Sequence, residues 1–291
     1  MAAARKMLAL VVAAVGLASS DVWAFGTNER VEVPIRQVTL SNGVIRYSVP
    51  VSIGGTAPIE AMLDTGSFGL RVLKGALLSS RYEPTEIQRN YPFGSGVRLR
   101  GIIARAVVSI GTASTGAPIP IHVVQSVDCV ESKPNCPASK LRPVDYRIGG
   151  DGFPREGFEA ILGLSMRSPQ VQMGALNPLS SIGSRSWIVV LPRPGEASSG
   201  QLIVNPSPAE QAGFTLFRMK RQPTHAGGEE DGAGWMDTTI PACVGPADAT
   251  QVACSSTRID TGGSMATIRP FWSHAVLFEQ NEGIIGIKAR Q

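Results

Sequence analysis

The chain contains the sequence Asp-Thr-Gly twice, once near each end, and this repeat limits the possible folds more than any other feature. The copies are Asp64-Thr65-Gly66 and Asp260-Thr261-Gly262. Each follows an apolar run, so each is predicted to be a strand that ends by presenting a carboxylate, a hydroxyl and a glycine. Two copies are expected by chance in about 0.001 chains of this composition. The repeat therefore requires a chemical explanation, whereas one copy would indicate an ordinary strand-to-turn junction.

Composition predicts a globular, all-β protein. The 291 residues are 43% hydrophobic and 17% charged, which is enough to build a sizeable core. The 32 glycines and 21 prolines lie mostly in short clusters between apolar runs, a pattern typical of strands joined by turns. The net charge of +4 is mild and no basic cluster alternates with aromatic residues, so nucleic acid is not expected as a partner.

The N-terminus resembles a secretory signal peptide. Arg5 and Lys6 precede an apolar run at residues 7–17, and small residues flank Trp23 before a cleavage site after Ala24. The alternative, a membrane anchor, is less favoured because the run is shorter than the roughly 20 residues of a membrane span. We therefore expect removal of residues 1–24, export to the periplasm or beyond, and no stable membrane insertion afterwards.

The four cysteines form two local pairs in the sequence. In an oxidising compartment the simplest of three connectivities is Cys129–Cys136 and Cys243–Cys254. Zinc is the alternative, but these spacings match no zinc pattern and no histidine adjoins a cysteine. We expect two disulfides and neither a metal nor another cofactor.

Alternating and apolar runs predict the order of strands. Residues 31–44 read as one or two leading strands, and residues 47–53 and 59–63 as a hairpin that ends at Asp64. Further strands are expected at residues 97–102, 104–110, 119–123, 160–164, 187–191, 201–204, 275–279 and 283–287. Short helices are predicted at residues 74–80 and 269–274, and a mobile loop at residues 224–234. Because each half carries one Asp-Thr-Gly, we expect two lobes, at residues 25–183 and 184–291.

Two carboxyl groups held within hydrogen-bonding distance repel each other when both are ionised, which costs free energy. They share one proton, so one apparent pKa is low and the other is raised. Such a pair can take a proton from water as it attacks a carbonyl carbon and can donate a proton to the carbonyl oxygen. Asp64 and Asp260 therefore suggest hydrolysis of amide bonds without a covalent intermediate.

These residues resemble the pepsin-like aspartic proteases, specifically a short bacterial member. Besides the two motifs, Phe93-Gly94-Ser95-Gly96 resembles the flap that covers the substrate, and Ile161-Leu162-Gly163 resembles the segment beside the first aspartate. The resemblance covers roughly residues 49–287. It implies a two-lobed acid-protease fold, a peptide or protein substrate, and a catalytic dyad of Asp64 and Asp260.

The resemblance also implies roles for neighbouring residues. Thr65 and Thr261 would hydrogen-bond across a pseudo-twofold axis, while Gly66 and Gly262 would permit close approach of the loops. The Ser67 hydroxyl would donate to Asp64 and help to keep it ionised. The flap and substrate-binding residues would be Tyr91, Phe93, Gly94, Ser95 and Gly96.

Four features depart from the family pattern. Gly263 replaces the Ser or Thr expected beside Asp260, with Ser264 as the nearest substitute. Phe93 replaces the flap Tyr, and Arg71 replaces the Trp that pairs with it. Tyr91 could compensate only if the hairpin register shifted. Only 31 residues follow Asp260, which implies a reduced C-terminal lobe.

Two functions remain open from the sequence. The first is an exported aspartic endopeptidase, and the alternative is a pepsin-fold protein that binds a peptide or protein partner without cleaving it. A serine hydrolase is not favoured, because the sequence around Ser165 lacks the final glycine of a nucleophile elbow. The sequence predicts neither the cleavage preference nor the oligomeric state.

Overall fold

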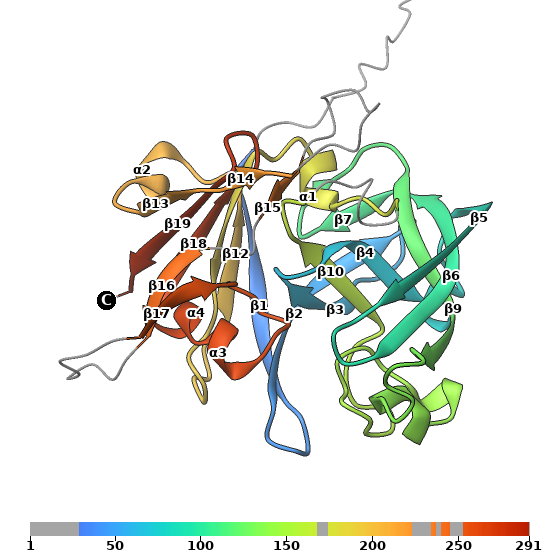
Figure 1. Ribbon diagram of the computed structural model, residues 1–291. Coiled ribbons are helices and arrows are strands. Elements are labelled where there is room, and N and C mark those ends of the chain that lie inside the picture. Colours follow the sequence, from blue (N-terminus) through green and yellow to red (C-terminus); the bar gives the residue numbers. More distant parts are fainter. Residues whose placement is uncertain (1–28, 168–173, 223–233, 237–239, 245–252, 291) are drawn as a thin grey trace, which may run out of the picture.

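The computed structural model describes residues 29–167, 174–222, 234–236, 240–244 and 253–290 (Figure 1). The predicted signal peptide at residues 1–24 lies outside the described residues, and so does the predicted mobile loop at residues 224–234 except for Gly234. None of the helices in these ranges has the length and apolarity that a membrane span requires.

The described part of the chain is mostly β, as the composition predicted. The strands are β1 (Val31–Thr39), β2 (Ile45–Ile53), β3 (Ile59–Asp64), β4 (Phe68–Leu73), β5 (Glu83–Pro92), β6 (Val97–Ala106), β7 (Val108–Ile110), β8 (Ala113–Ser114), β9 (Ile119–Cys129), β10 (Ala160–Leu164), β11 (Ser186–Val190), β12 (Gly200–Val204), β13 (Thr215–Arg218), β14 (Lys220–Arg221), β15 (Trp235–Met236), β16 (Ile240–Val244), β17 (Ala253–Thr257), β18 (His274–Glu279) and β19 (Ile284–Ala289). The helices are η1 (Lys74–Leu77), η2 (Pro137–Lys140), η3 (Pro143–Asp145), α1 (Pro178–Ser181), α2 (Pro208–Gln211), α3 (Met265–Ile268) and α4 (Pro270–Ser273).

Strand β1 connects two groups of strands. Among the described residues, one mixed sheet of 15 strands runs in the order β13-β19-β18-β11-β12-β1-β2-β3-β10-β4-β9-β6-β5, with β7 and β8 attached at β2. The first part of β1 pairs with β12, and its last part pairs with β2. Figure 1 shows β3, β4, β6, β9 and β10 on one side of β1, and β12, β18 and β19 on the other. Strands from the two halves of the sequence therefore flank β1.

The main hydrophobic core extends through both strand groups. Leu63 from the first half belongs to the same buried cluster as Trp187 and Phe278 from the second. The rings of Trp187 and Phe278 stack with their centroids 5.9 Å apart. Trp272 Nε1 also donates to the hydroxyl of Tyr47 at 2.8 Å, which connects α4 to β2. Because protein interiors are close-packed, this shared core holds the two strand groups in a defined relative position.

Strand β10 places a glycine beside the first Asp-Thr-Gly. It runs parallel to β3 with Gly163 opposite Asp64, and antiparallel to β4 with Gly163 opposite Gly69. A Cβ at position 163 would lie 2.7 Å from backbone atoms of Ser67 and Phe68, closer than non-bonded atoms approach. Only glycine lets the three strands meet at the turn after Asp64. This position is the one expected for the apolar-apolar-Gly segment.

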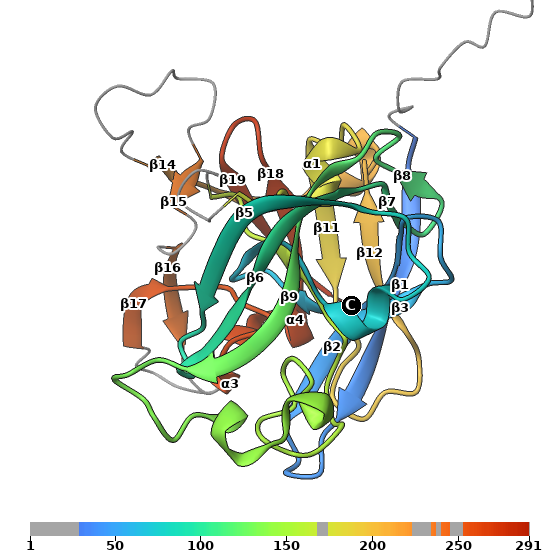
Figure 2. The same cartoon turned by 90° about the vertical axis from the view of Figure 1, so that its right-hand side faces the viewer.

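A hairpin of β5 and β6 forms beside β9 (Figure 2). The strand predicted from residue 97 is the start of β6, whereas the preceding strand β5 was not predicted. In the turn, the Phe93 N–H donates to Val97 O at 2.8 Å, and Gly96 has a φ of +92°. Strand β5 has no apolar alternation that would predict it, because it is a largely exposed, polar edge strand with two prolines. Strand β6 continues to Ala106, so the strand predicted at residues 104–110 is divided between β6 and β7.

The remaining differences concern short elements. The helix predicted at residues 74–80 is the short 3₁₀ turn η1, and the helix predicted at residues 269–274 is α4, which follows α3. Strands β4 and β13 and the hairpin of β16 and β17 were not predicted. Their segments are not clear apolar runs, since β4 contains Arg71, β13 is largely exposed, β16 contains Pro241 and β17 is rich in serine and threonine.

One of the two predicted disulfides is confirmed. Cys129 at the end of β9 is bonded to Cys136, with a sulfur–sulfur distance of 2.08 Å. Cys243 and Cys254 occupy directly opposite positions in the ladder of β16 and β17. Their side chains lie outside the described part of the structure, so the second disulfide remains a prediction.

Candidate active site

Two short loops carry the Asp-Thr-Gly sequences, and each loop follows a buried apolar residue. Leu63 is fully buried immediately before Asp64, and Ile259 is 3% exposed immediately before Asp260. Burial of such a side chain contributes about 1.5–3 kcal/mol, so each loop is anchored in the core directly before its carboxyl group. Both aspartates line the same cleft.

The threonines tie the two loops together by reciprocal hydrogen bonds. The Thr65 N–H donates to Thr261 Oγ1 at 3.1 Å, and the Thr261 N–H donates to Thr65 Oγ1 at 3.1 Å. Each hydroxyl in turn donates to a carbonyl of the opposite loop, Thr65 to Ile259 O at 3.2 Å and Thr261 to Leu63 O at 2.7 Å. Both threonines are buried, so the contact across the two halves is the one that the resemblance implied.

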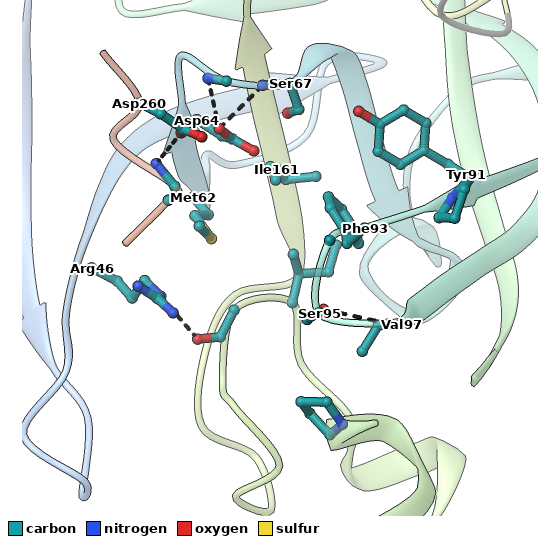
Figure 3. A pocket seen from close by; sticks show the side chains of 18 of the residues that line it. Arg46, Met62, Asp64, Ser67, Tyr91, Phe93, Ser95, Val97, Ile161 and Asp260 are labelled. Atoms are coloured by element: carbon teal, nitrogen blue, oxygen red, sulfur yellow. Dashed lines mark hydrogen bonds between the residues drawn. The ribbon is translucent and has the colours of Figure 1, made fainter. Parts of the chain in front are cut away.

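The glycines bring the two carboxyl groups into contact. The Gly66 N–H donates to Asp64 Oδ1 and the Gly262 N–H donates to Asp260 Oδ1, each at 2.8 Å. A Cβ at position 66 would overlap the carboxyl group of Asp260, and a Cβ at position 262 would lie 2.6 Å from Asp64 Cγ. Figure 3 shows Asp64 and Asp260 adjacent at the cleft. Glycine is required here because there is no space for a side chain.

The two carboxyl groups are not equivalent. Burial, the charge of Asp64 and a hydrogen bond with Asp64 raise the pKa of Asp260 to about 7. Asp64 Oδ1 accepts two backbone N–H groups, from Gly66 and, at 3.2 Å, from Ser67, whereas Asp260 accepts only that of Gly262 among the described residues. Hydrogen bonds to a carboxylate favour its charged form. We therefore expect the shared proton to reside mainly on Asp260.

The expectation that the Ser67 hydroxyl group supports Asp64 is wrong. Ser67 Oγ is buried and has no hydrogen-bond partner in the described structure, so the Ser67 backbone N–H, and not its hydroxyl, supports Asp64. At position 263 a Cβ would overlap Thr267 Oγ1 and lie 2.9 Å from Asp260 Oδ2. Thr267 Oγ1 donates instead to the Asp260 backbone carbonyl at 3.2 Å. A side chain at position 263 would therefore displace Thr267 Oγ1 or the Asp260 carboxyl group, and Thr267 supports the backbone of this loop.

The hairpin contributes one wall of the cleft. Tyr91, Phe93, Gly94 and Ser95 line it, as predicted for the flap. The rings of Tyr91 and Phe93 meet edge to face with their centroids 5.1 Å apart, and Figure 3 shows both on the hairpin at the cleft that holds the aspartates. Gly96 does not line the cleft: a Cβ there would lie 2.6 Å from Lys133 Cβ, in the loop closed by the disulfide.

Arg71, at the position where the family pattern has a Trp, packs against the hairpin. Its guanidinium carbon lies 3.4 Å from the centroid of the Tyr91 ring, a close cation–π contact, and Nη1 donates to Phe68 O at 2.5 Å. Burial lowers the pKa of Arg71 to about 10, so it stays charged at neutral pH, and the nearby carboxyl group of Asp64 favours this charged form. Tyr91, two residues before Phe93, is therefore the flap residue that contacts position 71.

The cleft around the two carboxyl groups has a volume of about 500 Å³. Sequence reasoning missed three arginines that line it: Arg46, Arg167 and Arg258. Arg258 carried a detectable signal, since it lies two residues before Asp260, but Arg46 and Arg167 enter the cleft only through the tertiary fold.

No protein-family model matches the chain, and no curated protein matches it significantly.

Replacing Thr65 or Thr261 by Val is expected to destabilise the protein by about 2–4 kcal/mol. Each change removes two cross-loop hydrogen bonds and leaves a buried N–H and a carbonyl without a partner, and each such group costs roughly 1–3 kcal/mol. Urea unfolding measures the loss. Thr215→Val on β13, where the side chain is exposed, is the matched control and is expected to change stability by less than about 0.5 kcal/mol. Equal stability of all three variants would contradict the cross-loop contact.

Proposed function

We propose that the protein is an exported aspartic endopeptidase with a pepsin-like, two-lobed fold whose C-terminal lobe is reduced. The observation that carries the proposal is the pair of hydrogen-bonded carboxyl groups, Asp64 and Asp260, in a cleft walled by a hairpin. The strand groups on either side of β1 would be the lobes, each contributing one Asp-Thr-Gly loop. The Cys129–Cys136 disulfide supports export, because disulfides persist in oxidising compartments.

The asymmetry between the carboxyl groups suggests the direction of proton transfer. Asp64, with two backbone N–H donors, is the ionised group and would accept a proton from a water molecule as the water oxygen attacks the scissile carbonyl carbon. Asp260 would donate the shared proton to the carbonyl oxygen, which gives a neutral gem-diol. Return of a diol proton to Asp260, with transfer of the Asp64 proton to the amide nitrogen, would then break the C–N bond and restore the dyad.

The hairpin would position the peptide over the dyad. Tyr91 and Phe93 present aromatic surface toward the cleft, and Gly94 at the turn has open space around it. A cleft of about 500 Å³ falls within the ordinary range for small-ligand sites and accommodates only part of a peptide chain. Arg71 beneath Tyr91 would hold the hairpin in place while the substrate enters.

Peptidase activity is expected to fall as the pH rises through about 7. The raised pKa of Asp260 retains the shared proton up to that pH, and its loss leaves no acid for the carbonyl oxygen. The measurement is kcat/KM for a fluorescence-quenched peptide from pH 3 to 9. Undiminished activity at pH 9 would contradict a mechanism that needs the shared proton.

The decisive test is incubation of the mature protein with an unfolded protein substrate from pH 3 to 7, with and without a statine-type inhibitor. Cleavage that the inhibitor abolishes supports the proposal. Binding of the unfolded chain without cleavage over the whole range would favour the alternative, a pepsin-fold protein that binds peptides without hydrolysing them. Cleavage that the inhibitor leaves unchanged would indicate a contaminating protease or a different mechanism.

A further inference from the structure

The cleft around the dyad is rich in positive charge. Among the described residues, three arginines line it, and the carboxyl groups that line it are those of Asp64, Asp260 and Asp151. Because Asp64 and Asp260 share one proton, three positive charges of these described residues face two negative ones. Arg46 is paired with Asp151 at 2.9 Å. This balance favours a ligand that brings negative charge into the cleft.

Two of the three arginines already have polar partners. Arg46 contacts Asp151 and also donates to Gly149 O at 3.3 Å. Arg167 donates to Gly66 O at 2.6 Å, so it supports the loop that carries the first aspartate. These contacts assign both residues to the construction of the cleft walls.

Arg258 differs from the other two arginines. It is partly buried in the cleft, and within the described ranges no residue provides it with a hydrogen bond or an ion pair. The pKa values of Asp260 and Tyr91 are raised by burial, and the positive charge of Arg258 partly opposes this rise at both residues. Arg258 therefore interacts with both the second aspartate loop and the hairpin. A guanidinium has five N–H donors, and its planar fork matches a carboxylate. Within the described part of the chain, Arg258 therefore presents beside the dyad a guanidinium group that has no polar partner and whose shape suits a carboxylate.

We propose that Arg258 is a specificity-determining residue that selects peptides with an aspartate or glutamate next to the scissile bond. The proposal rests on the peptidase function proposed above. When the scissile carbonyl of a peptide lies over the dyad, the substrate residues on either side of it lie only one residue spacing away along the peptide, about 3.5 Å. Arg258 is only two residues from Asp260 in the sequence. Arg258 also offsets the repulsion that the negative charge of the dyad exerts on an entering carboxylate.

The test uses pairs of fluorescence-quenched peptides that differ only by Glu or Gln at each of the two positions adjoining the cleaved bond. At pH 6, kcat/KM is expected to favour Glu at one of these positions by about tenfold to a hundredfold, the usual range for a hydrogen bond to a charged group. This preference should disappear in Arg258→Gln and persist in part in Arg258→Lys. Arg269→Gln, which changes an exposed arginine outside the cleft, is the matched control and should leave it unchanged.

The outcomes separate this proposal from the peptidase proposal. Efficient cleavage without a Glu preference, or a preference that survives in Arg258→Gln, overturns the role of Arg258 and leaves the peptidase function intact. If the wild type cleaves no peptide, the peptidase function fails, and affinities for the same peptides with the central amide reduced decide the inference. Tighter binding of the Glu peptide to wild type but not to Arg258→Gln supports acidic-peptide recognition. Equal binding, or none, overturns it.

Discussion

Asp64→Asn and Asp260→Asn are each expected to lower kcat by about a thousandfold or more. Neither carboxyl group alone can accept the proton of water and also protonate the carbonyl oxygen, and loss of general acid–base catalysis alone costs about 10²–10⁴ in rate. Asparagine has nearly the same shape and keeps a carbonyl oxygen for the Gly66 or Gly262 N–H, so the loops should remain folded. The measurement is kcat for a fluorescence-quenched peptide at the pH optimum of the wild type.

Asp128→Asn provides the control for this comparison. Asp128 is paired with Arg98 and Arg100 outside the cleft, and its replacement is expected to change kcat by less than about twofold. Wild-type turnover in either active-site variant would place the chemistry elsewhere.

The stability of Asp260→Asn reports on the dyad without any assay of activity. In the native state the pKa of Asp260 is raised to about 7 from an ordinary value of 3.8, so between these values the folded protein binds more protons than the unfolded chain. Wild-type stability therefore falls as the pH rises from about 4 to about 7. Asn does not titrate, so the variant should gain stability relative to wild type over this window in urea unfolding. A constant difference would mean that Asp260 is not buried against a second carboxylate.

The contact between the two aspartate loops was predictable because the residues that form it belong to one short sequence, Asp-Thr-Gly, that occurs twice. Thr65 and Thr261 form the cross-loop hydrogen bonds that the motif implied, and Gly163 lies beside Asp64. The strands with clear alternation were also found. The polar edge strand β5 was not, since its pairing with β6 depends on main-chain hydrogen bonds rather than on an apolar face.

Arg71 and Ser67 show what local sequence patterns leave undetermined. Arg71 stands in the buried strand β4, and a charged residue within such a run signals a specific partner. That partner, Tyr91, lies on a different strand and could be identified only from the fold. The direction of the Ser67 hydroxyl depends on a side-chain rotamer, which the sequence does not specify. The role of the Ser67 hydroxyl group was therefore assigned wrongly, although Asp64 and Asp260 were expected together and do lie together.

Gly66→Ala is expected to lower kcat by about a hundredfold or more and to destabilise the protein by about 1–3 kcal/mol, the usual range for overpacking. The added methyl group would overlap the carboxyl group of Asp260, so the two loops would have to separate and the carboxyl groups would lose their shared proton. Gly75→Ala in η1, where a Cβ meets no atom within 4 Å and φ is not positive, is the matched control and should leave kcat unchanged.

The measurements are kcat and the pH at which activity falls. This pH should move below 7 in Gly66→Ala, because a more distant Asp64 raises the pKa of Asp260 less. If Gly66→Ala keeps wild-type turnover and the same upper pH limit, the loops do not meet at Gly66 and the dyad is not the functional unit.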